Sequence, residues 1–298
     1  MNNKYVRIII VIITIFILLP GCSGKSKDNK ASKPNMEAAQ KPPQELKTLL
    51  TDIESMITDL AGLIAMENKY VSQIKIADSQ ASKNTESDQS KNEQTDSQAK
   101  SGQQNKSSDQ KKTADTSDQQ QKKWQTLTSK LKDIHKNWNK IESEAIKAGL
   151  TVTERNKFET IMENLTLDIS QQKQMSGLQD AIELYGQYAS LAKVFKSDIP
   201  AEYYKTKYEI MAAGVEALGG DWDQAVNRLP RLKDNWNSFK VKAKVKNEKL
   251  LNCSDLSIDD FAAAVSGKKI DILIIKAEIA LANLGQIEKS LSQSKKAQ

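Results

Sequence analysis

The sequence predicts an all-α protein built as an antiparallel helical bundle, and three observations support this prediction. Apolar residues recur at spacings of three and four through most of the chain, which is the period of a helix with one buried face. No segment alternates apolar and polar residues between turn residues, so no strand is predicted. Short turn sequences separate the periodic segments, and short connections favour antiparallel neighbours. The predicted helices are 44–76, 122–148, 151–174, 178–199, 200–218, 221–243, 257–265 and 269–291.

Turn and capping residues set the boundaries of the first four helices. The first follows a pair of prolines. Gly149 is expected to end the second, because glycine readily takes the backbone conformation that closes a helix. Thr151 and Glu154 form a capping box, in which each side chain bonds the other's free backbone N–H. Ser176 and Gly177 are expected to separate the third helix from the fourth.

Similar signals mark the last four helices. Asp198 and Pro200 are expected to open the fifth, since an acid caps free N–H groups and proline suits the first turn. Pro230 lies inside the sixth helix and should kink or restart it. Ser257 is expected to begin a short seventh helix. The last helix carries a second apolar row, at Ile272, Ile275 and Ile279. A helix that is apolar over so wide an arc should lie centrally in the bundle.

Residues 78–121 are predicted to form a long disordered insert. Alanines are their only apolar members, and the charged residues are intermixed with Ser, Gln, Asn and Thr. Such a composition cannot bury enough surface to offset the entropy lost on ordering.

The second and sixth helices share a repeat built around tryptophan. At an offset of 98 residues Trp124 aligns with Trp222 and Trp138 with Trp236, and both later members stand in Asn-Trp-Asn. Heptads alone would align leucines, but they would not align the only tryptophans of the chain. The sequence therefore predicts two related four-helix units, 44–199 with the insert and 200–298. Each pair of tryptophans spans 14 residues, so both project from one seam, as in a coiled coil.

The N-terminus has the layout of a secretory signal. Lys4 and Arg7 precede an almost wholly apolar run over 8–19. Pro20-Gly21 stops that run short of the roughly 20 residues that a membrane span needs. Residues 1–21 are therefore predicted to be a signal peptide.

Leu19-Pro20-Gly21-Cys22 resembles the lipobox of bacterial lipoproteins, although Pro20 stands where a small residue is more usual. In that family the cysteine receives a diacylglyceryl group and the signal is cut before it. The resemblance implies that Cys22 carries acyl chains such as palmitate and that residues 22–43 are a flexible tether. It also implies anchoring at the extracytoplasmic face of the cell membrane, which two acyl chains make stable.

Charge and chemistry exclude several function classes. The net charge is +6, and it becomes +4 after loss of residues 1–21, which hold two basic residues and no acid. This is too mild to favour nucleic-acid binding. His135 is the only histidine, and Cys253 has no disulfide partner once Cys22 is lipidated. No phosphate-binding glycine loop, serine elbow or zinc spacing occurs. No metal, cofactor or catalytic residue is therefore predicted.

Aromatic residues are the candidate binding residues. The tryptophans Trp124, Trp138, Trp222 and Trp236 are either large core wedges or the lining of a groove that holds a partner helix or ligand. Tyr204 and Tyr208, near Lys205 and Lys207, either stack on sugars or peptides of the cell wall or sit at the core edge with wet hydroxyls.

These features predict a lipid-anchored helical bundle of the cell envelope that is not an enzyme and works by binding. The partner is expected to be another envelope protein, or the bundle acts as a scaffold at the membrane surface. The alternative is a small-ligand carrier or sensor with a pocket between bundle helices. A hydrolase would need an interior carboxylate pair that the sequence does not single out. Nothing in the sequence indicates the oligomeric state.

Overall fold

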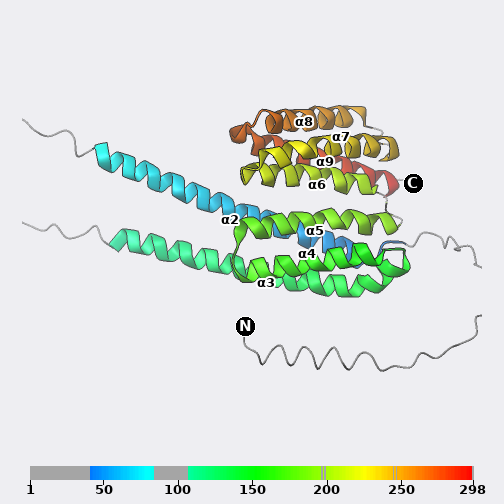
Figure 1. The fold of residues 1–298 in the computed structure, drawn as a ribbon, viewed down its shortest axis with the longest axis horizontal. Helices are drawn as coiled ribbons and strands as arrows, with labels where there is room; N and C mark the ends of the chain where they lie inside the picture. The colour runs from blue at the N-terminus through cyan, green and yellow to red at the C-terminus, as the bar shows by residue number, and fades with distance from the viewer. Residues whose placement is uncertain are drawn as a thin grey trace, which may run out of the picture. The chain divides into compact units, whose positions relative to one another are not determined.

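The computed structural model describes residues 41–83, 107–195, 197, 199–243, 245 and 247–296. Residues 1–40, with the predicted signal peptide, Cys22 and most of the tether, lie outside this part. Every regular element in the described residues is a helix (Figure 1). The helices are α2 (Gln44–Lys83), α3 (Ser107–Lys147), α4 (Val152–Ser170), α5 (Gln174–Val194), α6 (Ala201–Leu218), α7 (Trp222–Ala243), α8 (Glu248–Ser266) and α9 (Ile270–Lys296).

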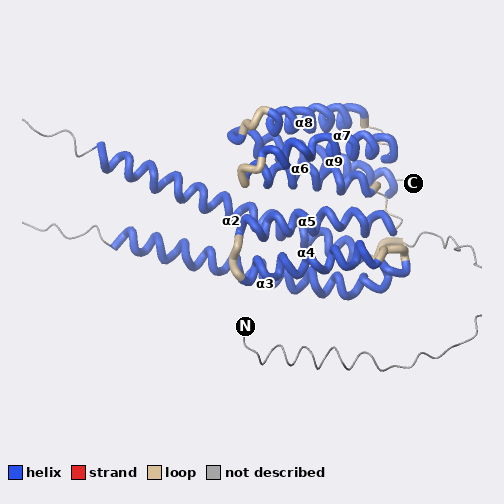
Figure 2. Tube along the Cα trace, in the orientation of Figure 1, coloured by secondary structure: helices blue, strands red, loops and turns tan. Residues whose placement is uncertain are grey.

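The helices lie side by side, and short turns at alternate ends join most consecutive ones (Figure 2). Within the N-terminal half α2 packs on α3 and α5, and α4 packs on α5. Within the C-terminal half α6 packs on α7 and α9, and α8 packs on α9. The contact between α5 and α6 joins the halves, and a continuous apolar core runs through both. The predicted all-α helical bundle is confirmed.

The capping box at the start of α4 is confirmed. The Glu154 backbone N–H donates to Thr151 Oγ1 at 3.2 Å, and the Thr151 backbone N–H donates to Glu154 Oε2 at 3.0 Å. The Thr151 backbone N–H and the Thr151 hydroxyl both donate to the Glu154 carboxylate, which stabilises its ionised form and lowers the pKa of Glu154. Pro230 lies inside α7, which runs without a break from Trp222 to Ala243, so the helix is not restarted there. Pro200 is the N-cap of α6, whereas Asp198 falls outside the described residues.

Two predicted boundaries are wrong. Ser176 and Gly177 lie inside α5, and the break before α5 is at Gln171 to Lys173, where Gln172 has a left-handed φ of 55°. Gly177 is buried against α4 and α2, and its φ is not left-handed, so it does not reverse the chain. The helix predicted to begin at Ser257 begins at Glu248, with Asn247 as its N-cap. Ser257 lies inside this helix, where its hydroxyl is satisfied by donating to the Ser254 carbonyl one turn earlier.

The last helix, α9, is not central. Leu273, Ala280, Leu284 and Ile287 form its buried side, whereas Ile272, Ile275 and Ile279 are 40, 55 and 45% exposed. No described helix covers this second row. The central position belongs to α5 and α6, whose buried residues face several neighbours at once.

Helix also extends into the segment predicted to be disordered. The structure continues α2 to Lys83 and begins α3 at Ser107, so both ends of 78–121 are helical. Alanine, glutamine and lysine are good helix formers, and a helix that has started in the core extends at little cost. Residues 84–106 lie outside the described part.

The two halves match in local detail. Gln172 and Lys268 are 96 residues apart, occupy corresponding turns before α5 and α9, and have φ values of 55° and 51°. The Trp138 indole N–H donates to Glu159 at 3.4 Å, and the Trp236 indole N–H donates to Asp255 at 2.5 Å. These two carboxylates are also 96 residues apart. The duplication of a four-helix unit stays a prediction, which these parallels favour.

Candidate functional site: an apolar groove between three helices

An apolar groove of about 770 Å³ lies between α2, α6 and α9. Its lining comes from α2, α6 and α9, with two residues of α5. Its apolar lining residues are Ile57, Ala61, Gly62, Ile64, Ala65, Leu178, Ile182, Ile210, Met211, Gly214, Val215, Leu218, Leu273, Ile274, Ala277 and Leu281. Polar side chains are few, which is typical of sites that hold small apolar molecules.

Small residues keep the groove open. A methyl group placed on Gly62 or on Gly214 would meet no atom within 4 Å. Glycine within a helix costs about 1 kcal/mol relative to alanine, and neither position needs glycine for backbone geometry. The missing side chains therefore add directly to the empty volume.

A charged pair closes one end of the groove. Lys207 Nζ donates to Glu54 Oε1 at 2.5 Å, and the lysine side chain is only 14% exposed. The ammonium group also lies 5.4 Å from the ring centre of Tyr185 and 5.6 Å from that of Tyr203. Burial raises the pKa of both tyrosine hydroxyls, so they stay neutral at physiological pH. This end offers a polar group to a ligand that is otherwise in apolar surroundings.

The four tryptophans do not line the groove. Trp124, Trp138 and Trp236 are buried, and Trp222 is half-buried against the core. The ring of Trp138 stacks on Phe158 with centroids 4.3 Å apart. The structure therefore places the tryptophans as core wedges, the first of the two alternatives.

The two candidate tyrosines also lie away from an open binding surface. Tyr204 is buried, with its ring 5.0 Å from that of Tyr188 and 5.3 Å from that of Tyr203, so the expectation of a wet hydroxyl is wrong for it. This aromatic cluster consists of two tyrosines from α5, Tyr185 and Tyr188, and two from α6, Tyr203 and Tyr204. Tyr208 is half-buried, and its hydroxyl donates to Glu183 at 2.6 Å.

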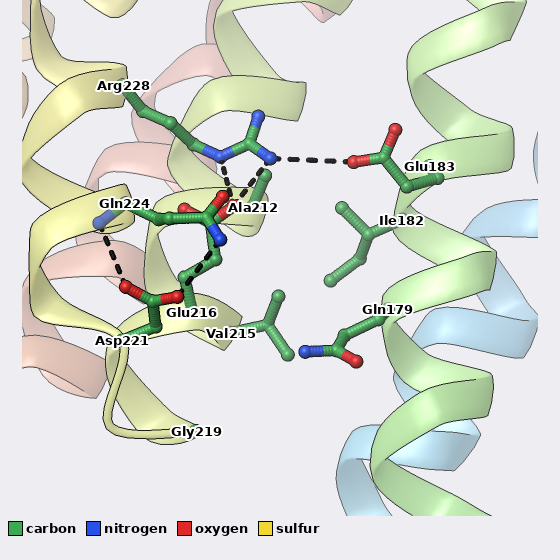
Figure 3. A pocket seen from close by; sticks show the side chains of 10 residues that line it. All are labelled: Gln179, Ile182, Glu183, Ala212, Val215, Glu216, Gly219, Asp221, Gln224 and Arg228. Carbon is green, nitrogen blue, oxygen red and sulfur yellow. Dashed lines mark hydrogen bonds and ion pairs between the residues drawn. The ribbon is translucent and has the colours of Figure 1, made fainter.

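A second, polar cleft of about 300 Å³ lies where α5, α6 and α7 meet (Figure 3). Arg228 extends from α7 and contacts Glu216 at 2.6 Å, Glu209 at 3.3 Å and Glu183 at 3.5 Å. It also donates to the Tyr208 hydroxyl at 3.1 Å. These partners engage the guanidinium from several sides, so the cleft is better suited to joining helices than to binding an anion.

One carboxylate pair comes together inside the bundle. Asp168 near the end of α4 accepts a hydrogen bond from the Ser176 hydroxyl and pairs with Lys173 at 3.7 Å. Asp180 of α5 lies close enough to Asp168 for the two carboxyl groups to interact. Burial, followed by the charge of Asp168, raises the pKa of Asp180 to about 6. Neither aspartate lines the apolar groove or the polar cleft.

Asp180→Asn is expected to stabilise the protein above pH 6. The folded state binds the Asp180 proton more tightly than the unfolded state does, because the pKa rises from 3.8 to about 6. Stability is therefore lost as the pH rises through this interval, and asparagine removes that loss. Thermal unfolding at pH 4 and at pH 7.5 measures it, with Asp234→Asn on the exposed face of α7 as the control. If the stability gained by Asp180→Asn over the wild type did not increase from pH 4 to pH 7.5, the raised pKa of Asp180 would be contradicted.

The chain's only histidine, His135, and its second cysteine, Cys253, lie outside the groove and the polar cleft. His135 Nε2 lies 2.9 Å from Thr166 Oγ1, and burial lowers the pKa of its imidazole. Cys253 is exposed and free. Across the described residues, no three His, Cys, Asp or Glu side chains gather in a way that would hold a metal ion.

The groove was not predicted from the sequence. The one available signal was the set of small residues inside strongly helical segments, Ala61-Gly62 and Gly214. Comparison with protein-family models, with curated proteins and with solved structures finds no match. Within the part of the chain that the structure describes, no helix is long and apolar enough to span a bilayer. Fold and site together define an all-α helical bundle with an apolar inter-helix groove.

Proposed function

We propose that this protein is a non-catalytic binding protein, anchored through lipid on Cys22 at the extracytoplasmic face of a membrane. Its site is the groove between α2, α6 and α9, and its ligand is a small, elongated apolar molecule. The observation that carries the proposal is the groove itself. Its volume of about 770 Å³ lies within the range of roughly 300 to 1,000 Å³ that is common for small-molecule sites.

The shape of the groove favours a chain-like ligand. Its lining on α2 extends from Glu54 to Ala65, which corresponds to about 16 Å along a helix axis. Each methylene buried there contributes about 0.8 kcal/mol. An alkyl or prenyl chain would fill this length and place a polar group beside Lys207. A lipid-anchored protein stands next to a bilayer, which contains such chains.

The polar residues of the groove favour binding over catalysis. They are Glu54, Thr58, Lys207 and Glu278. Lys207 is paired with Glu54, and the lining residues include no histidine or cysteine to act as a base or nucleophile. That the protein also contacts another envelope protein stays a prediction.

Filling the groove is expected to weaken ligand binding at least about tenfold, or ~1.4 kcal/mol. Gly214→Leu places a branched apolar side chain in the empty space above α6. Fluorescence titration of the mature chain carrying Cys22→Ser, with a fluorescent fatty acid as the probe, measures the affinity.

Gly285→Leu is the matched control for this experiment. Gly285 is a helical glycine of α9 with equally open surroundings, but it does not line the groove. Both substitutions raise helix propensity, so neither is expected to unfold the protein. Equal affinities in the wild type and both variants would refute the groove as the binding site. Native mass spectrometry of protein from its own host would then identify any molecule that it does retain.

A further inference from the structure

The charged residues of the apolar groove lie toward one of its ends. On α2 the lining begins at Glu54 and ends at Ala65. On α6 it begins at Lys207 and ends at Leu218. The two helices run in the same direction (Figure 1), and Lys207 contacts Glu54, so these two residues mark the same end of the groove. The opposite end, around Ala65 and Leu218, is apolar.

A second acid, Glu278 of α9, also lies toward the polar end. The Tyr203 hydroxyl near the start of α6 donates to Glu288 near the end of α9 at 2.8 Å, so these two helices run in opposite directions. Along α9 the groove therefore takes Ile274 nearer its apolar end and Glu278 nearer its polar end. Glu278 is exposed, and no described lysine or arginine forms an ion pair with it.

Lys207, the one cation among the lining residues of the groove, is already neutralised. Its ammonium group donates to Glu54 at 2.5 Å and lies over the rings of Tyr185 and Tyr203. A carboxylate ligand that paired with Lys207 would displace Glu54, and the displaced acid would lose its partner. The lysine therefore gives little net attraction for an anionic head group.

Carboxylates outnumber the lysine at this end of the groove. Glu54 and Glu278 line it, and Glu288 lies behind it, where it accepts the Tyr203 hydroxyl. Burial raises the pKa of that hydroxyl, and the charges of Glu288 and Glu54 raise it further. Both acids therefore act on the same buried point. Three carboxylates against one ammonium group leave the polar end with a net negative charge.

We propose that the groove selects a chain with a cationic head group, a long-chain amine. The head group pairs with Glu278, the acid that has no cation of its own, and the chain extends toward Leu218. An ammonium group there leaves the pair of Lys207 with Glu54 intact, whereas a carboxylate is repelled. The inference rests on the proposed function, because it names the ligand class of that same groove.

Competition between three ligands with the same chain tests the head group. The mature chain carrying Cys22→Ser is loaded with a fluorescent fatty acid, and dodecylamine, dodecanol or dodecanoate displaces it at pH 7 and low salt. The amine is then a cation and the carboxylate an anion. The amine is expected to bind at least about fivefold more tightly than the carboxylate, with the alcohol between them. Added salt is expected to reduce this difference, because it screens exposed charges.

Two variants change the charge of the polar end. Glu278→Gln removes an exposed charge and leaves the buried pair intact, so the protein is expected to fold normally and to prefer the amine by only about twofold or less. Glu54→Gln frees Lys207, so dodecanoate is expected to bind at least about fivefold more tightly than it binds the wild type. Glu163→Gln, an exposed position of α4 outside the groove, is the matched control and should keep the wild-type preference.

Different results judge the head group and the groove. Equal affinities for the three ligands, or tightest binding of dodecanoate, would overturn the cationic head group, and weaker binding of all three by Gly214→Leu would still show that the groove holds the chain. An amine preference that Glu278→Gln leaves unchanged would also overturn the assignment. If Gly214→Leu changed none of the affinities, the groove would be refuted as the site and the head-group inference with it.

Discussion

Replacing Arg228 with methionine is expected to lower the free energy of unfolding by about 3 to 5 kcal/mol. The arginine side chain is only 13% exposed, and its guanidinium contacts Glu183, Glu209 and Glu216 from three sides. Methionine preserves much of the apolar stem but removes the charge. Glu183 and Glu216 then lose this cation and Glu209 keeps only Arg231, so three carboxylates repel one another in partly buried surroundings. Urea denaturation monitored by circular dichroism at pH 7 measures the loss.

Two further variants show whether charge or packing causes that loss. Lys136→Met removes an exposed lysine whose ion pair with Asp133 is also exposed, and it is expected to change stability by less than about 0.5 kcal/mol. Adding Glu216→Leu to Arg228→Met is expected to recover part of the loss, because it removes one unpaired carboxylate. Glu216 Oε2 already has no hydrogen-bond partner in the folded protein. If Arg228→Met lowered the free energy of unfolding no more than Lys136→Met does, the ion pairs of Arg228 with the three glutamates would have no role in stability.

Features of the sequence that act locally were predicted well. The capping box of Thr151 and Glu154 depends on three consecutive peptide units, and it forms as expected. The central position of α9 was predicted wrongly, since a wide apolar arc indicates only what a helix is able to bury. Whether a neighbour covers the arc depends on the other helices, and none of those described covers Ile275 or Ile279.

The candidate site was harder to predict because core and groove residues follow the same helical period. Trp138 and Ile274 both fit apolar stripes, yet one is buried and the other is open to the groove. Empty volume arises from side chains that are absent, and it depends on how far apart two helices lie. The spacing of apolar residues along one helix does not predict the distance between that helix and its neighbour.

Glycines illustrate the same limit. Gly186 and Gly214 both interrupt strongly helical sequences, and the sequence does not distinguish them. A methyl group on Gly214 would meet open space, whereas one on Gly186 would lie 2.8 Å from the ring carbons of Tyr208. Gly214 therefore helps to form the groove, whereas Gly186 allows α5 and α6 to approach closely.

Gly186→Leu is therefore expected to destabilise the protein by about 3 kcal/mol, at the upper end for an overpacked core. The Tyr208 ring has little freedom to move away. Its hydroxyl donates to Glu183 at 2.6 Å and accepts from Arg228 at 3.1 Å, and the guanidinium lies 5.2 Å from the ring centre. A shift of the ring would break those bonds as well. The gain in helix propensity from removing glycine, under about 1 kcal/mol, offsets only part of the cost.

Urea denaturation of Gly186→Leu, Tyr208→Ala and the double variant measures this contact directly. Tyr208→Ala removes the ring and leaves room for leucine, so the double variant should lose less stability than the sum of the two single losses. The expected coupling is about 1 kcal/mol or more. Gly214→Leu is the matched control, and its stability is expected to equal or exceed that of the wild type because the added Cβ meets no atom within 4 Å and the groove is open beyond it. Additive losses from Gly186→Leu and Tyr208→Ala would show that the ring does not limit how closely the two central helices pack.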